Sequence, residues 1–245
     1  MRLTYALCLA FLIAIGTPVG ALSASVPSTG CDKSRFAPAQ PVMEQVQYGF
    51  DFLAAKHPIG SMTVGIVCGP DLVWSKSYGY ADMETGKAAN RDTVYRIGSI
   101  TKQFTGLMLL QLVDDGRVKL SDAVEKYFPD IRNVDGNAAL AQPITLEQLA
   151  THRAGLSREP DDQRFLIGPV AEWDEITRSA LPHVKYQFEP GKFYSYSNIG
   201  YAILGAALSR AADQSYTDYV QQHILSPLGM RHTGFEPNAE MLAEL

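Results

Sequence analysis

The segment from Tyr95 to Gly116 constrains the fold more than any other part of the chain. It predicts a helix with almost no polar face, formed by Ile100, Phe104, Leu107, Met108, Leu109, Leu110, Leu112 and Val113. Such a helix is typically buried on nearly all sides, so other elements must pack around it. Gly116 should end it, because glycine readily adopts the left-handed conformation found at helix C-termini. With 46% hydrophobic residues among 245, the chain can supply the surrounding core.

This helix begins with the tetrad Ser99-Ile100-Thr101-Lys102. A spacing of three residues places Lys102 on the same helix face as Ser99 and one turn away. A serine hydroxyl attacks a carbonyl only where a neighbouring group accepts its proton, and a neutral lysine or a phenolate can do so. Burial removes hydration from an ammonium, which lowers its pKa and frees the amine to take a proton. An exposed capping serine beside a solvated lysine would instead predict polar neighbours, but the neighbours include Phe104 and Leu107.

A second polar cluster, Tyr196-Ser197-Asn198, follows the turn Glu189-Pro190-Gly191. Taken alone, Tyr196 is typical of a core aromatic residue and Asn198 of a turn. A phenol and an amide two residues apart in an extended segment can, however, both point at one site. We therefore predict that Tyr196 is the second base, and that Asn198 binds substrate by holding Lys102 and a substrate amide in register.

The sequence before the long helix predicts one helix and a hairpin. Apolar residues recur at helical spacing after Pro41, so a helix should begin there and end before Pro58. Two short β-rich runs, Met62–Val67 and Leu72–Tyr78, flank a turn that contains glycine and proline.

The sequence after it predicts shorter helices and a polar loop. Thr145 is placed to cap a short helix, and an apolar helix rich in small residues should follow Asn198. Residues 157–168 are polar and irregular, which is typical of surface loops that line sites.

The N-terminus predicts an export signal over residues 1–24. Arg2 provides a positive start, Leu3–Ile15 an apolar core, and small residues lead to Ala21 or Ala24. The apolar run is shorter than the roughly 20 residues of a membrane span, although an uncleaved anchor remains an alternative. Residues 25–40 resemble a linker, which leaves 41–245 as the catalytic domain. We expect an exported protein, either periplasmic or secreted.

The chain contains three cysteines, of which Cys8 lies inside the predicted signal. In an exported protein Cys31 and Cys68 can pair as a disulfide. Alternatively, Cys31 is acylated after a lipoprotein cleavage site, which would attach the protein to a membrane. Two free thiols are the third alternative.

Several functional classes are excluded by composition and motifs. The net charge of -5 and the scattered Lys and Arg residues offer no basic surface for nucleic acid. The five histidines show no metal-binding spacing, so His152 and His232 are predicted to be structural or exposed. The sequence also lacks a Gly-x-Ser-x-Gly elbow, a phosphate loop and a dinucleotide fingerprint. We expect no metal and no cofactor.

Four ordered blocks together resemble the serine β-lactamase-related family. They are Arg96–Phe104, Ile144–Leu156, Pro190–Tyr201 and Pro227–Phe235. The family includes class C β-lactamases, D-alanyl-D-alanine carboxypeptidases of the penicillin-binding type, and esterases. Its shared Ser-x-x-Lys motif matches Ser99 and Lys102, and Tyr196 and Asn198 match its Tyr-x-Asn motif.

The resemblance implies an α/β fold of the α+β type. An antiparallel sheet would be flanked by helices, with an inserted all-helical lobe and the site at their junction. It also implies acyl transfer: Ser99 attacks an amide or ester, Lys102 and Tyr196 share the proton transfers, and the Ser99 N–H donates to the oxyanion. The substrate would be a β-lactam, a peptidoglycan-like D-Ala-D-Ala peptide or an ester.

One departure from the family pattern concerns its third motif, Lys-Thr-Gly or His-x-Gly on a strand. We interpret His232-Thr233-Gly234 as a chance match in a loop, so the C-terminal strands are expected to lie beyond Leu245. A sheet without them would keep an unpaired edge, and activity should be weak or absent. The alternative function is a catalytically silent relative that binds peptidoglycan fragments or a partner through the same cleft.

Overall fold

The computed structural model describes residues 40–56, 60–69, 71–162, 164 and 173–243. These residues form two compact units that divide between Arg91 and Asp92, so the predicted domain of residues 41–245 comprises both. The predicted signal peptide, Cys8 and Cys31 lie outside the described residues.

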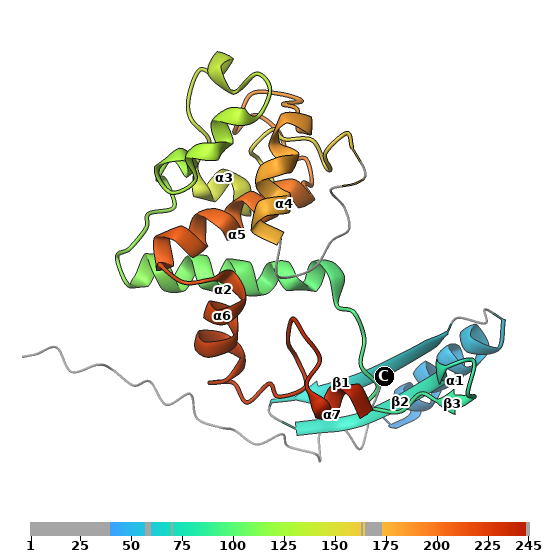
Figure 1. Ribbon diagram of the computed structural model, residues 1–245. Helices are drawn as coiled ribbons and strands as arrows, with labels where there is room; N and C mark the ends of the chain where they lie inside the picture. Colours follow the sequence, from blue (N-terminus) through green and yellow to red (C-terminus); the bar gives the residue numbers. More distant parts are fainter. Residues whose placement is uncertain (1–39, 57–59, 70, 163, 165–172, 244–245) are drawn as a thin grey trace, which may run out of the picture. The chain divides into compact units, whose positions relative to one another are not determined.

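The first unit combines one helix with a small antiparallel sheet (Figure 1). Helix α1 spans Gln40–Lys56, and the strands β1 (Ser61–Cys68), β2 (Asp71–Asp82) and β3 (Lys87–Ala88) pair in that order. The predicted helix and hairpin are therefore confirmed. Strand β3 was not predicted, because two residues are too short to show any alternation of polar and apolar side chains.

The hairpin register pairs Ser61 with Gly79 and Cys68 with Asp71. Gly79 has φ of 77°, and a Cβ built there would lie 2.3 Å from the carbonyl oxygen of Gly60. Only glycine fits this close approach without strain. Cys68, the last residue of β1, is disulfide-bonded.

The regular elements described in the second unit are all helices, joined by turns and loops that include isolated β-bridges. Its elements are η3 (Gly98–Ile100), α2 (Thr101–Asp114), η4 (Val124–Lys126), η5 (Pro129–Asn133), η6 (Asn137–Ala139), α3 (Leu146–Ala150), α4 (Trp173–Ala180), η9 (Leu181–His183), α5 (Asn198–Ala212), α6 (Tyr216–Val220), η10 (Gln221–Leu225) and α7 (Ala239–Ala243).

Helix α5 is the centre of this unit, since it contacts α2, α3, α4 and α6 (Figure 1). Its small residues Gly205, Ala206 and Ala207 are all buried, and they let neighbouring helices approach closely. Leu204 of α5 and Leu112 of α2 are fully buried in the shared core. Burying a leucine side chain contributes about 1.5–3 kcal/mol, so this packing stabilises both helices.

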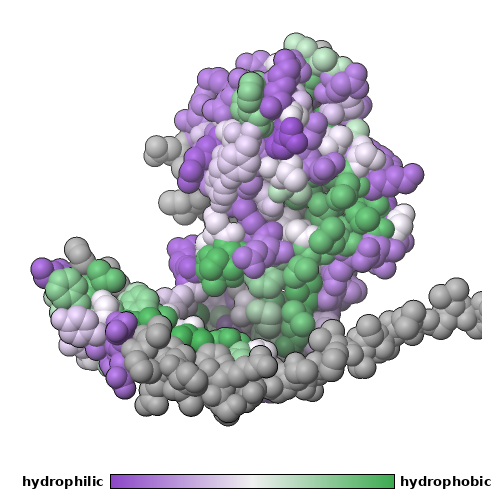
Figure 2. All heavy atoms as spheres, turned by 180° about the vertical axis from the view of Figure 1, so that it is seen from behind, coloured by the Kyte–Doolittle hydropathy of each residue, from purple (hydrophilic) through white to green (hydrophobic). Residues whose placement is uncertain are grey.

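The prediction that α2 is buried on nearly all sides is wrong. Met108 and Leu112 are fully buried, but Ile100, Leu107 and Leu110 expose 54%, 44% and 52% of their surface. Within this unit α2 contacts α5, α6 and η10, and a count of apolar residues does not reveal which side chains of the helix those contacts cover. In Figure 2, hydrophobic side chains accordingly gather in patches on the otherwise largely hydrophilic surface of this unit.

Three predicted helix boundaries are confirmed. Helix α2 ends at Asp114, and Gly116 adopts the left-handed conformation with φ of 71°. Thr145 caps α3 through a reciprocal pair of hydrogen bonds with Gln148, the arrangement known as a capping box. An apolar helix, α5, begins at Asn198.

No helix in the described parts of the chain combines the length and apolar character that a bilayer crossing requires.

Candidate active site

Ser99 lies in the short helix η3, directly before α2. Gly98 has φ of 51° and starts this turn, a conformation that side chains other than glycine rarely adopt. Ser99 is therefore exposed near the N-terminal end of α2, where the first backbone N–H groups of a helix have no intrahelical acceptor. The positive end of the helix dipole favours negative charge at the same place.

Lys102 lies one turn further along and contacts two of the other predicted residues. Its Nζ donates hydrogen bonds to Ser99 Oγ at 3.3 Å and to Asn198 Oδ1 at 2.7 Å. The same nitrogen lies 4.9 Å from the ring centre of Tyr196 and 5.4 Å from that of Tyr201. Lys102 is half-buried, whereas the sequence predicted a fully buried side chain. The faces of the two tyrosine rings attract a positive charge and so compensate for the water that the amino group loses on burial.

Tyr196, which lies two residues before the start of α5, contacts the same serine oxygen. Its hydroxyl donates to Ser99 Oγ at 2.7 Å. Hydrogen bonds with Lys102 and Ser99 lower the pKa of the Tyr196 phenol below its usual 10, and the positive charges of Lys102 and Arg158 lower it further. The surroundings of Tyr196 stabilise the phenolate more than water does, and its oxygen lies within hydrogen-bond distance of the Ser99 hydroxyl.

Asn198 is held by the start of α5 and by the preceding loop. The Ser197 side chain caps the helix by accepting from the Gly200 N–H at 2.9 Å. The Asn198 backbone N–H donates to the Arg158 carbonyl at 2.9 Å, and its Nδ2 donates to the Glu159 carboxylate. The sequence predicted a site-lining loop here but did not single out Glu159, since no spacing links it to the motifs.

His152 packs against the ring of Tyr196 and binds the backbone of the next residue. It has φ of 58°, its Nδ1 accepts from the Ser197 N–H at 3.1 Å, and its ring centre lies 4.4 Å from that of Tyr196. Burial lowers the pKa of the imidazole, and the charge of Lys102 lowers it further, so the neutral, accepting form is favoured. This half-buried position fits the structural role that the sequence predicted.

The structure thus joins Tyr196, Ser99, Lys102 and Asn198, in that order, in one chain of hydrogen bonds within the second unit. His232 lies in a turn, where its Nε2 is 3.5 Å from Glu240. Across the described ranges, no group of three or more His, Cys, Asp or Glu side chains is arranged to hold a metal ion. The strand-borne third motif stays a prediction.

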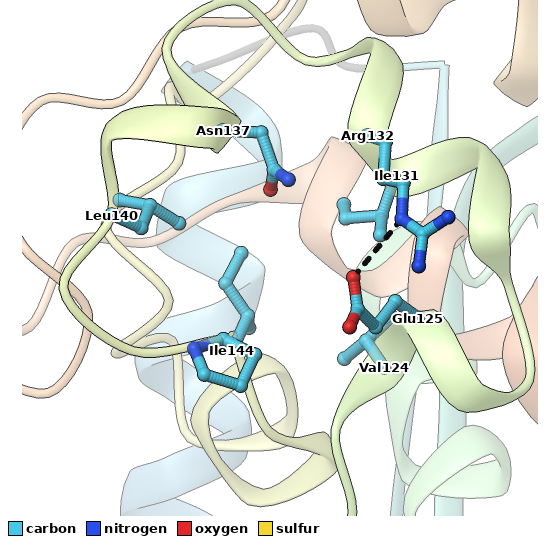
Figure 3. A pocket seen from close by; sticks show the side chains of 8 residues that line it. Val124, Glu125, Ile131, Arg132, Asn137, Leu140 and Ile144 are labelled. Atoms are coloured by element: carbon cyan, nitrogen blue, oxygen red, sulfur yellow. Dashed lines mark hydrogen bonds and ion pairs between the residues drawn. The ribbon is translucent and has the colours of Figure 1, made fainter.

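A separate pocket of about 360 Å³ lies among η4, η5 and η6 (Figure 3). Glu125 and Arg132 form an ion pair of 3.2 Å at its side, and Leu140 and Ile144 line it. None of the four predicted site residues is among its lining residues. This pocket is therefore separate from the predicted site residues, which surround the exposed Ser99.

Comparison with known proteins connects this geometry to one family. A family model described as Beta-lactamase matches residues 43–243. Among curated relatives, protein flp of Staphylococcus aureus (strain MW2) is 33% identical over 182 residues, which are 74% of this chain and 36% of that protein. The chain spans about a third of the length of the curated relatives it matches.

Two solved structures show the same fold. A beta-lactamase/D-alanine carboxypeptidase from Yersinia pestis, complexed with citrate, is 32% identical and has a TM-score of 0.60; the match covers 76% of this chain and 52% of that one. A class C beta-lactamase in complex with cefoxitin is 22% identical with a TM-score of 0.68; the match covers 84% and 54%. The second likeness concerns the fold alone. The predicted mixture of helices and antiparallel sheet is confirmed, and the predicted lack of C-terminal strands stays a prediction.

Proposed function

The chain belongs to the Beta-lactamase family, and from this premise we propose that it is an exported serine hydrolase that forms an acyl-enzyme on Ser99. The family is one of serine hydrolases. The single observation that carries the proposal is that Ser99 Oγ is hydrogen-bonded by both Tyr196 and Lys102. A serine so placed has a proton acceptor and a cation within reach.

Acylation begins when the Tyr196 phenolate takes the proton of Ser99 Oγ and that oxygen bonds to the substrate carbonyl carbon. The electron pair of the C=O bond moves to oxygen, where the Ser99 backbone N–H donates a hydrogen bond. The carbonyl then re-forms, the C–N or C–O bond breaks, and the Tyr196 phenol protonates the leaving group. Lys102 stabilises the phenolate by its charge throughout.

Deacylation repeats these steps with water. The Tyr196 phenolate takes a proton from the water while the water oxygen attacks the acyl carbonyl carbon. The Tyr196 phenol then returns the proton to Ser99 Oγ as the ester bond breaks. The products are a carboxylic acid and the free enzyme, with Tyr196 again a phenolate. In this scheme Tyr196 is the general base and then the general acid in both half-reactions.

The proposed substrate is a β-lactam, a D-Ala-D-Ala peptide of the peptidoglycan type, or a small ester. Support comes from the similar proteins, one of which is called a D-alanine carboxypeptidase and another of which binds cefoxitin. Asn198 supports an amide substrate, because an asparagine NH₂ has two hydrogens and Glu159 takes one of them. The other can donate to a substrate carbonyl.

The proposal is tested by labelling the protein with a fluorophosphonate or a fluorescent penicillin and measuring intact mass. We expect one adduct on Ser99, none in Ser99→Ala, and full labelling in Ser226→Ala, which alters an exposed serine of the same unit. Folded native protein that neither takes the label nor hydrolyses p-nitrophenyl acetate would instead support a catalytically silent binding relative.

Export is part of the same proposal and has its own measurement. The sequence of residues 1–24 supports cleavage by a signal peptidase. Mass spectrometry of protein from periplasmic or culture fractions should show a chain that begins after Ala21 or Ala24. A chain that begins at an acylated Cys31 would identify a lipoprotein, and an intact Met1 in the cytoplasm would contradict export.

A further inference from the structure

We propose that Glu159 is a positioning residue that orients the Asn198 amide so that its oxygen faces Lys102, an inference that rests on the proposed function. Glu159 Oε1 accepts from Asn198 Nδ2, and Asn198 Oδ1 accepts from Lys102 Nζ at 2.7 Å. Lys102 in turn donates to Ser99 Oγ. The carboxylate thus stands at the far end of a chain of hydrogen bonds that leads to the nucleophile.

The donors and acceptors in this series of hydrogen bonds follow from the chemistry of its two ends, Lys102 and Glu159. An ionised carboxylate only accepts hydrogen bonds and an ammonium only donates them, whereas an amide has one accepting and one donating end. A reversed Asn198 amide would set its oxygen against the Glu159 carboxylate and its NH₂ against the Lys102 ammonium. Both contacts would be repulsive. Glu159 therefore favours the single orientation of the Asn198 amide in which the oxygen faces Lys102.

The backbone holds Glu159 in a defined place. The Arg158 carbonyl accepts from the backbone N–H groups of Asn198 and Ile199, which ties this loop to the first turn of α5. The Ser157 hydroxyl donates to the Glu159 carbonyl at 2.9 Å, and Arg158 Nε lies 3.8 Å from the carboxylate. With 32% of its side chain exposed, Glu159 is sheltered enough for the contact to matter.

The first test measures kcat/KM for hydrolysis of p-nitrophenyl acetate. Because displacing a catalytic group by about 1 Å can reduce rates by about 100-fold, we expect Glu159→Ala to lose about 10-fold to 100-fold. Glu159→Gln should recover part of the loss, since its amide oxygen still accepts from Asn198. Glu175→Gln, which removes an exposed carboxylate on α4, is the matched control and should stay within about twofold.

A double-mutant cycle separates positioning from general damage. If Glu159 acts through Asn198, then Glu159→Ala should change kcat/KM by less than about twofold in an Asn198→Ala background, because contacting residues are not additive. Losses that multiply would overturn the proposal, as would unchanged activity in Glu159→Ala alone.

A measurement without turnover keeps this inference distinct from the proposed function. In ¹⁵N-labelled protein, the Asn198 side-chain NH₂ signals, assigned by their loss in Asn198→Ala, should show one proton shifted downfield by the carboxylate. Glu159→Ala, which removes the acceptor, should abolish that shift and leave the signals of other asparagines in place. A native protein that takes no label on Ser99 defeats the proposed function, whereas Asn198 signals indifferent to Glu159→Ala defeat this inference.

Discussion

The hydroxyl of Tyr196 lies 2.7 Å from Oγ of Ser99, although 97 residues separate them in the chain. Lys102, one helical turn from the serine, lies further from the same oxygen, at 3.3 Å. The shorter contact and the lowered phenol pKa are the reasons why we propose Tyr196, rather than Lys102, as the group that accepts the serine proton. Local spacing had suggested lysine as an equal candidate for the base.

Tyr196→Phe removes the proposed base and keeps the ring. General base catalysis typically contributes about 100-fold to 10,000-fold, so acylation of Ser99 by a fluorophosphonate should slow by about that factor. Tyr194→Phe, which alters a neighbouring exposed tyrosine, is the control and should react like the native protein. Equal rates in native protein and Tyr196→Phe would show that another group takes the proton.

The pH dependence of acylation should follow the Tyr196 phenol. The reactive form is the phenolate, so kcat/KM should rise with pH, with a midpoint below the usual 10 because the hydrogen bond and charge of Lys102 lower this pKa. Lys102→Gln removes that charge and should move the midpoint upward. Tyrosinate absorbance, measured against Tyr196→Phe, reports the same titration without turnover. A midpoint indifferent to Lys102→Gln would contradict the assignment.

The four predicted site residues could be read from sequence because each belongs to a short motif on one local element. Ser99 and Lys102 share a helix turn, and Tyr196 and Asn198 flank the cap of α5. That the two motifs meet was expected from their complementary chemistry and from the resemblance, since no local pattern brings α2 against α5.

Glu159 and the detailed role of His152 could not be predicted in the same way. Both act through hydrogen bonds to the start of α5, and the sequence separation of these bonds is 39 and 45 residues. Such contacts depend on tertiary packing, as does the exposure of Leu107 and Leu110, which apolar composition alone had suggested would be buried. Composition indicates which side chains can be buried, whereas tertiary packing determines which of them are.

Ser197→Ala should destabilise the second unit. The buried hydroxyl caps α5 through the Gly200 N–H and donates to the Ser157 carbonyl at 2.7 Å. Loss of a helix cap costs about 0.5–2 kcal/mol, and the Ser157 carbonyl loses its partner as well, so about 1–3 kcal/mol is expected in chemical denaturation. Ser215→Ala removes the exposed cap of α6 and should cost less. The reverse order would show that the α5 cap is not a main support of the site.

His152→Asn should weaken the protein and alter its response to acid. Asparagine tolerates the left-handed backbone, and its Oδ1 can replace Nδ1 as the acceptor for Ser197, so the main loss is the ring packing on Tyr196 and Tyr201, about 1–2 kcal/mol.

The native imidazole has a pKa below 6.5, lowered by burial and by Lys102, and the other groups packed on it are the rings of Tyr194, Tyr196 and Tyr201. The unfolded chain therefore binds the proton first as pH falls. The stability due to neutral His152 is complete above pH 6.5 and is lost as pH falls through the lower native pKa. Urea unfolding at several pH values between about 8 and 5 should show a shallower decline for His152→Asn than for native protein. Parallel declines would mean that the imidazole keeps its ordinary pKa in the folded chain, and that its contact with Ser197 does not depend on the neutral form.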